Sequence, residues 1–263
     1  MSRVLAVVNQ KGGVGKTTTA INLAAALAAN DLQVLVIDSD PQGNATTGLG
    51  VAKAVDRASL YHVLLGDAAP EDAVVQTDFE GLSLIGADKN LVGANLELVE
   101  LKDREFRLRE RIQTLRNKYR FILIDCPPAL DLLTLNALIA ADAVVVPIQC
   151  EFFALEGISE LMDTIDRIQA AFKHPLEIEG ILLTMFDDRT NLTRQVANDL
   201  KEFFGSKVFS TVIPRSVRLA EAPSFGKPII SYDPRSKGAE SYIQLAKEIL
   251  DHEQKRKSAQ SAR

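Results

Sequence analysis

Short runs of apolar residues alternate along the chain with longer segments of helical periodicity. Because the runs FILID and AVVVPIQ are apolar at nearly every position, their strands should be covered on both faces. This alternation predicts a doubly wound α/β fold, with a mostly parallel sheet and helices on both faces. The expected strands are RVLAVVN (3–9), QVLVID (33–38), FILID (121–125), AVVVPIQ (143–149), GILLTMF (180–186) and VFSTVIP (208–214).

The pattern continues without a break that would separate two domains. With 263 residues, of which 46% are hydrophobic and 25% are charged, the chain is long enough to bury one large core. It has no internal repeat and no low-complexity linker. We therefore expect a single domain over residues 1–263, in which the polar stretch HEQKRKSAQSAR forms a flexible tail at about 252–263.

Composition narrows the classes of function. No segment approaches the ~20 apolar residues of a membrane span, and the first apolar run is too short for a signal peptide, so a cytoplasmic protein is expected. Cys126 and Cys150 end apolar runs, where buried reduced thiols are expected rather than a disulfide, zinc or iron–sulfur site. His62, His174 and His252 are scattered, and we expect them at the surface or at helix ends. The net charge of −5 argues against a uniformly basic surface but leaves local basic patches open.

The segment GGVGKTT follows the first predicted strand and opens a helix, which is the context of a phosphate-binding loop. Glycines let the loop turn tightly, so that its N–H groups face phosphates at the positive end of the helix. Lys16 would neutralise phosphate charge, and the Thr17 hydroxyl is a natural Mg²⁺ ligand. We therefore predict binding of ATP or GTP by Gly12, Gly13, Val14, Gly15, Lys16, Thr17 and Thr18.

Three carboxylates follow predicted strands that should lie near this loop. Asp125 ends FILID and would hold Mg²⁺ through a water molecule. Asp38 and Asp40 follow QVLVI at a spacing of two, so they point the same way if the strand extends that far. The alternative that one of them only caps the following turn stays open.

The segments KGGVGKTT, DSDPQGNAT and DCPP together resemble the deviant Walker A ATPases, the family of ParA/Soj, MinD, the nitrogenase iron protein and the arsenite-pump ATPase. The resemblance implies ATP and Mg²⁺ as ligands and an ATP-dependent homodimer, in which Lys11 reaches the phosphates bound by the other subunit. Gly12 would then lie near its twofold mate. Asp40 would orient the attacking water, and Asp38 would lie near the Mg²⁺ shell. The implied catalytic residues are Lys11, Lys16 and Asp40.

Within that family the chain looks like chromosomal ParA/Soj over almost its whole length, as in VLVIDSDPQGNATTGLG and VIPRSVRLAEAPSFGKPI. This resemblance implies partition of a chromosome or plasmid on the nucleoid, with a ParB-type partner that stimulates slow hydrolysis. The resemblance also implies that Arg189 and Arg218 contact double-stranded DNA without sequence preference. A local excess of basic residues between 187 and 237 supports this assignment. Possible neighbours at the DNA are Arg215, Lys227, Arg235 and Lys237, and possible base contacts are Met185 and Pro214.

Three alternatives use the same scaffold. A MinD-like membrane switch would need an apolar C-terminal amphipathic helix, but no bulky apolar residue follows Leu250. A redox protein would need cysteines at a dimer interface or in a C-x-x-C pair, which Cys126 and Cys150 do not match. A metabolic enzyme that phosphorylates a small substrate would not require Lys11 in trans.

Overall fold

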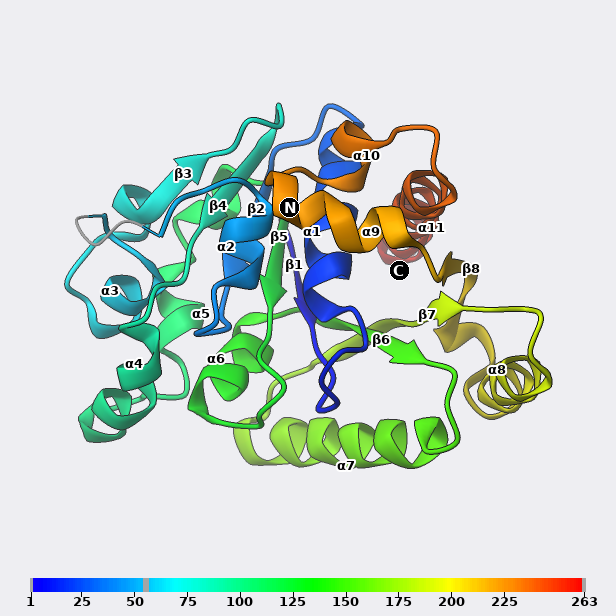
Figure 1. The fold of residues 1–263 in the computed structure, drawn as a ribbon. Helices are drawn as coiled ribbons and strands as arrows, with labels where there is room; N and C mark the ends of the chain where they lie inside the picture. Colours follow the sequence, from blue (N-terminus) through cyan, green and yellow to red (C-terminus); the bar gives the residue numbers. More distant parts are fainter. Residues whose placement is uncertain (1, 54–56, 262–263) are drawn as a thin grey trace.

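The computed structural model describes residues 2–53 and 57–261 and contains one sheet of eight strands in the order β3-β4-β2-β5-β1-β6-β7-β8 (Figure 1). All neighbouring strands are parallel except β3 and β4, which confirms the predicted fold class. The strands are β1 (Arg3–Val7), β2 (Val34–Asp38), β3 (Val74–Gln76), β4 (Leu82–Ile85), β5 (Phe121–Asp125), β6 (Ala143–Gln149), β7 (Glu177–Phe186) and β8 (Val208–Pro214). The six expected strands all form, whereas the short strands β3 and β4 were not predicted.

Helices cover both faces of the sheet. Successive strand residues point to opposite faces, so Val4 and Ala6 of β1 enter one hydrophobic core while Leu5 enters the other. Figure 1 shows α7 along one side and α1, α9 and α10 on the other. The α-helices are α1 (Lys16–Ala28), α2 (Asn44–Gly48), α3 (Leu60–Leu65), α4 (Leu91–Glu97), α5 (Arg107–Arg111), α6 (Leu132–Ala140), α7 (Ala154–Phe172), α8 (Asn191–Phe204), α9 (Val217–Glu221), α10 (Ile229–Tyr232) and α11 (Lys237–Ser261).

The register of the central strands aligns their carboxyl ends. Asp125 at the end of β5 pairs with Val7 of β1 on one side and with Asp38 of β2 on the other. The loop after β1 and the acidic ends of β2 and β5 therefore meet at one edge of the sheet. This is the edge at which parallel α/β sheets bind ligands.

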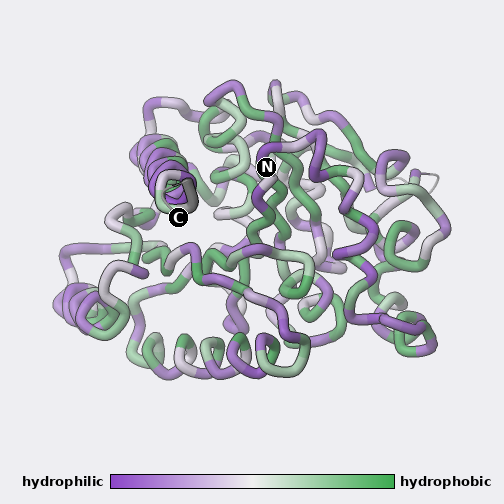
Figure 2. The backbone as a smooth tube through the Cα atoms, turned by 180° about the vertical axis from the view of Figure 1, so that it is seen from behind, coloured by the Kyte–Doolittle hydropathy of each residue, from purple (hydrophilic) through white to green (hydrophobic). Residues whose placement is uncertain are grey.

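The C-terminal segment differs from the prediction of a flexible tail at about 252–263. Helix α11 continues through it to Ser261, and residues 262–263 lie outside the described part. Viewed from behind, α11 is hydrophilic along most of its outer length (Figure 2). Its apolar side, which includes Tyr242, Leu245 and Ile249, is buried against the body. Ion pairs from His252, Glu253 and Arg256 to distant residues hold the first part of this segment, and local composition does not show such contacts.

Those ion pairs converge on Glu179, whose side chain is fully buried at the start of β7. It accepts a hydrogen bond from Arg256 and lies 3.4 Å from Arg3 and 3.3 Å from His252. Glu253 pairs in addition with Arg120. The network joins α11 to the amino-terminal edge of the sheet, opposite the edge that carries the loop.

The structure also bears on the predicted cysteines, histidines and membrane segments. Cys126 and Cys150 are free and buried, as predicted. His174 follows the C-cap of α7, one of the two places expected for the histidines; it is buried there, and its Nε2 donates to the carbonyl oxygen of Ala141 at 2.8 Å. Within the described residues, no helix has the length and apolar character needed to cross a membrane.

Replacing Glu179 with Ala should lower the free energy of unfolding by about 3 kcal/mol, because the change leaves buried basic groups without their carboxylate. Urea denaturation measures this difference. The matched control is Glu177→Ala, which removes a carboxylate that also pairs with Arg3 and Arg256 but has a side chain 58% exposed. Its cost should stay below about 1 kcal/mol. Equal losses in the two variants would contradict an anchoring role for Glu179.

Candidate nucleotide site

The loop between β1 and α1 has the backbone of an anion site. Gly13 and Gly15 adopt positive φ angles of 77° and 89°, which side chains with a Cβ rarely accept. Gly15 is the N-cap of α1, and no side chain caps the helix there. The first N–H groups of α1 are thus left to bind an anion at the positive end of the helix dipole.

Lys16 is folded back over this loop. Its side chain is largely buried, and Nζ donates to the carbonyl oxygen of Lys11 at 3.0 Å. Burial lowers the pKa of Lys16, while the nearby Asp125 carboxylate favours the charged form. The ammonium group therefore lies between the loop that faces the ligand and the acidic end of β5.

A buried asparagine, Asn9, positions the start of the loop, although no sequence motif predicts this role. Its Oδ1 accepts a hydrogen bond from the Lys11 backbone N–H at 2.9 Å, and its Nδ2 donates to the Pro147 carbonyl at 2.8 Å. Asn9 thus ties the loop to β6. The only signal in the sequence was a polar residue directly after an apolar strand. The Lys11 side chain is 52% exposed and forms an ion pair with Glu151, just beyond β6.

Asp125 is a buried carboxylate that lies beside the Thr17 side chain but accepts no well-formed hydrogen bond within the described residues. It has no exposed surface. Burial raises the pKa of Asp125 well above its usual range, and the Asp38 carboxylate adds to this, whereas Thr17 and Lys16 act in the opposite direction. An unpaired carboxylate beside a threonine hydroxyl fits a hydrated Mg²⁺ ion. The described residues contain no group of three or more His, Cys, Asp or Glu that could hold a metal alone, so phosphate oxygens would have to complete the shell.

Asp38 and Asp40 have different environments. Strand β2 ends at Asp38, which is fully buried and accepts hydrogen bonds from the backbone N–H and hydroxyl of Thr46, both at 2.7 Å. Burial raises the pKa of Asp38 to about 6. Asp38 therefore does cap the first turn of α2. Asp40 lies beyond the strand, partly exposed, and accepts from the Gln42 backbone N–H at 2.9 Å.

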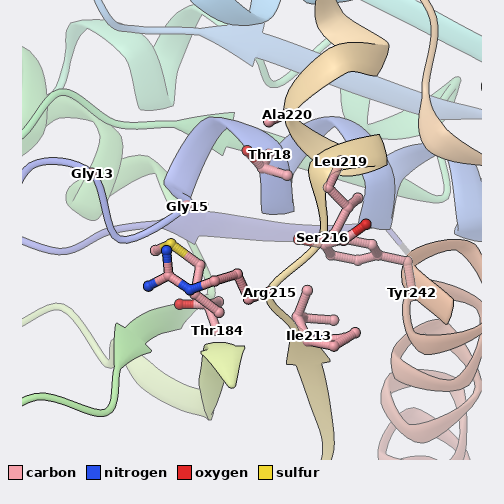
Figure 3. A pocket seen from close by; sticks show the side chains of 12 residues that line it. Gly13, Gly15, Thr18, Thr184, Ile213, Arg215, Ser216, Leu219, Ala220 and Tyr242 are labelled. Carbon is pink, nitrogen blue, oxygen red and sulfur yellow. The ribbon is translucent and has the colours of Figure 1, made fainter. Parts of the chain in front are cut away.

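A cavity of about 220 Å³ continues from the loop towards the ends of β7 and β8 (Figure 3). Both expected base contacts, Met185 and Pro214, line it. Met185 has a positive φ of 47°, unusual for a residue with a side chain. The Thr184 hydroxyl donates to the Val14 carbonyl at 2.8 Å, which joins β7 to the loop. The full lining is Gly13, Gly15, Thr18, Thr184, Met185, Ile213, Pro214, Arg215, Ser216, Leu219, Ala220 and Tyr242.

The predicted DNA-binding residues do not form a uniform set. Arg189 follows β7, is 84% exposed and makes a two-point ion pair with Asp187 at 2.6 and 2.8 Å. Arg218 on α9 pairs with Glu221 at 3.1 Å and with Asp233 at 3.6 Å. Arg215, in contrast, lines the cavity beside the loop. The remaining members, Lys227, Arg235 and Lys237, are exposed.

The fold and the loop together define a nucleoside-triphosphatase of the phosphate-loop class. A family profile described as an AAA domain matches residues 2–178. The chain is 52% identical over 258 residues to the chromosome partitioning protein ParA of Caulobacter vibrioides, covering 97% of each chain. It is 53% identical over 249 residues to the sporulation initiation inhibitor protein Soj of Bacillus subtilis, covering 95% of this chain and 98% of the relative. The chain belongs to the ParA/Soj family of ATPases.

A solved structure supports the same fold. The cobyrinic acid a,c-diamide synthase of Mycobacterium smegmatis, with bound ADP and magnesium, matches with a TM-score of 0.85 and 38% sequence identity, covering 97% of this chain and 96% of that chain. The resemblance that the sequence motifs indicated is therefore confirmed for the family and for the fold.

Replacing Asp125 with Asn should raise the free energy of unfolding of the nucleotide-free protein by about 1–2 kcal/mol, because it removes a buried carboxylate for which the cost of burial exceeds the favourable effect of Thr17 and Lys16. Since the folded protein raises the pKa of Asp125, the wild-type carboxylate becomes protonated in the folded state as the pH falls. The gain from the substitution should therefore shrink at lower pH. Urea titrations at several pH values without nucleotide measure it.

The same variant should lose most of the stabilisation that MgATP confers on the wild type. As a control, Asp142→Asn changes a carboxylate that accepts from the Val4 N–H at 2.8 Å and pairs with Arg116, so this substitution should destabilise the protein. A less stable Asp125→Asn protein would show that its carboxylate is satisfied after all.

Proposed function

We propose that this protein is an ATP-dependent dimerising switch that binds DNA without sequence preference and segregates a chromosome or plasmid with a ParB-type partner. The observation that carries the proposal is the similarity to partitioning proteins at above 50% identity over nearly the whole chain, together with the intact loop. The switch associates with the nucleoid when ATP is bound, and hydrolysis returns it to the free state.

The residues at the carboxyl edge of the sheet would bind ATP and Mg²⁺ and support hydrolysis. The loop from Gly12 to Thr18 binds the phosphates of ATP, and Lys16 neutralises their charge. Thr17 would hold Mg²⁺ together with the phosphates, with Asp125 and Asp38 nearby, and the ion would supply positive charge to the phosphates. Asp40, partly exposed beyond β2, orients the attacking water.

Lys11 acts across a pair of subunits in this proposal. Its ammonium is half-exposed, and its backbone is held by Asn9, so the side chain can move while the loop does not. A Cβ on Gly12 would meet nothing within 4 Å, so a glycine there fits close approach of the nucleotide or of a second copy. To reach a partner's phosphates, Lys11 must leave Glu151.

DNA is held by phosphate contacts from Arg189 and Arg218, with Lys227, Arg235 and Lys237 as further exposed cations. Each arginine forms an ion pair with a carboxylate in the protein without DNA. On binding, DNA phosphates would replace these carboxylates. One patch binds weakly, but an ATP-bound dimer doubles the contacts, so nucleotide state controls DNA affinity.

A second candidate is a small-molecule ligase activity, favoured by the 38% identity to cobyrinic acid a,c-diamide synthase. It would leave Lys11 without a function in trans. A MinD-like membrane switch has less support, because the apolar side of α11 is already buried against the body.

Binding to nonspecific duplex DNA with MgATP, with MgADP and without nucleotide tests the function. The wild type should bind only with MgATP, and affinity should fall steeply as salt rises. Arg189→Glu combined with Arg218→Glu should abolish binding. The control, Arg109→Glu with Arg167→Glu, makes the same change in net charge at exposed sites on α5 and α7 and should bind nearly as the wild type does.

Absence of DNA binding in every nucleotide state, despite an ATP-dependent dimer, would refute the partition function. Loss of binding in the control variant as well would show that net charge, and not this surface, controls affinity.

Substitutions of Lys11 and Lys16 should separate nucleotide binding from dimerisation. Lys11→Ala should bind MgATP within about threefold of the wild type, since only a solvent-screened contact is lost in the monomer, but it should fail to dimerise. Lys16→Ala should lose nucleotide binding itself, because an anion site loses its buried cation. Calorimetry and light scattering report the two properties. An ATP-dependent dimer of Lys11→Ala would contradict the role in trans.

A further inference from the structure

The segment from Pro214 to Glu221 separates the nucleotide cavity from the proposed DNA surface. It leaves β8 at Pro214, passes Ser216 at the N-cap of α9 and continues through that helix. Leu219 and Ala220 of α9 line the cavity, while Arg218 is exposed and pairs with Glu221. One short helix thus takes part in both surfaces.

Arg215 reaches the cavity from this segment. Its backbone N–H donates to the Phe186 carbonyl at 3.2 Å, which fixes the residue against the end of β7. Figure 3 shows its guanidinium extending across the cavity towards Thr184 and the side on which Gly15 lies. Arg189 and Arg218 both have carboxylate partners, whereas Arg215 makes no ion pair with the residues that the structure describes.

We propose that Arg215 is a nucleotide ligand, and that the segment Pro214–Glu221 couples nucleotide occupancy to the DNA contact of Arg218. Phosphates on the loop place the nucleoside in the cavity that continues past Gly15 and Thr18. There the planar guanidinium, near the Asp187 carboxylate but in no ion pair within the described residues, lies against the base and ribose and faces a π-system and oxygen acceptors. Arg215 thereby leaves the DNA-binding set in which the sequence had placed it.

The packing around α9 connects the nucleotide cavity to Arg218. Leu219 is buried, and a Cβ on Gly238 would lie 2.8 Å from its Cγ, so α9 rests directly on the first turn of α11. One turn further, Tyr242 lines the cavity, and its hydroxyl lies 3.2 Å from that of Thr19 in α1. A shift of α9 towards a bound nucleotide must therefore carry Arg218 with it, because densely packed contacts do not stretch.

The assignment of Arg215 as a nucleotide ligand does not depend on the proposed partition function. The coupling to the DNA contact of Arg218 rests on that function. The first experiment is calorimetry of MgATP and MgADP binding without DNA. Arg215→Ala should raise both Kd values by about threefold to fivefold, as expected for a partly exposed cation against a ring. Arg215→Lys should recover only part of this loss, because an ammonium cannot stack. Arg167→Ala, on the exposed face of α7, is the control and should leave both values unchanged.

The second experiment measures DNA affinity with saturating MgATP and with saturating MgADP. The ratio of the two affinities is the coupling, and it should fall at least about fivefold in Arg215→Ala. Unchanged nucleotide Kd values would overturn the ligand assignment and return Arg215 to the DNA surface. An unchanged ratio would overturn the coupling. A wild type that binds no DNA would refute the partition function, while the calorimetry would still decide the role of Arg215.

Discussion

The burial of two carboxylates beside one lysine is the constraint on which the site depends. Asp38 and Asp125 end neighbouring strands in register, and neither has any exposed surface. Asp38 is satisfied by Thr46, but Asp125 accepts no well-formed hydrogen bond within the described residues. Burial raises the pKa of both groups. The arrangement is therefore least favourable when the site is empty, and a cation bound there with phosphates would relieve it.

The rest of the molecule supports this edge of the sheet by hydrogen bonds between distant strands, loops and helices. Asn9 joins the loop to β6, Thr184 joins β7 to the same loop, and Tyr242 of α11 meets Thr19 of α1. Each link connects residues far apart in the sequence. At the opposite edge, the network around Glu179 fastens the end of α11. A scaffold held at both edges can keep the loop geometry fixed while exposed side chains such as Lys11 change partners.

Three exposed cations that the proposed function uses are already paired with carboxylates in the protein without ligand. Lys11 pairs with Glu151, Arg189 with Asp187, and Arg218 with Glu221. Such exposed pairs stabilise little and exchange readily for phosphate oxygens. The proposed switch, which would bind and release its partners in turn, would benefit from weak local pairing, because release would restore contacts that already exist.

The sequence by itself determined the fold class, the six main strands, the phosphate loop and the acidic strand ends, because apolar periodicity, glycine spacing and a polar residue after a strand are local patterns. Only the tertiary structure decided that Asn9 fixes the loop, that Asp38 caps α2 and that Arg215 enters the nucleotide cavity. It likewise decided that α11 extends to Ser261. These features rest on contacts between distant segments, which no local pattern encodes.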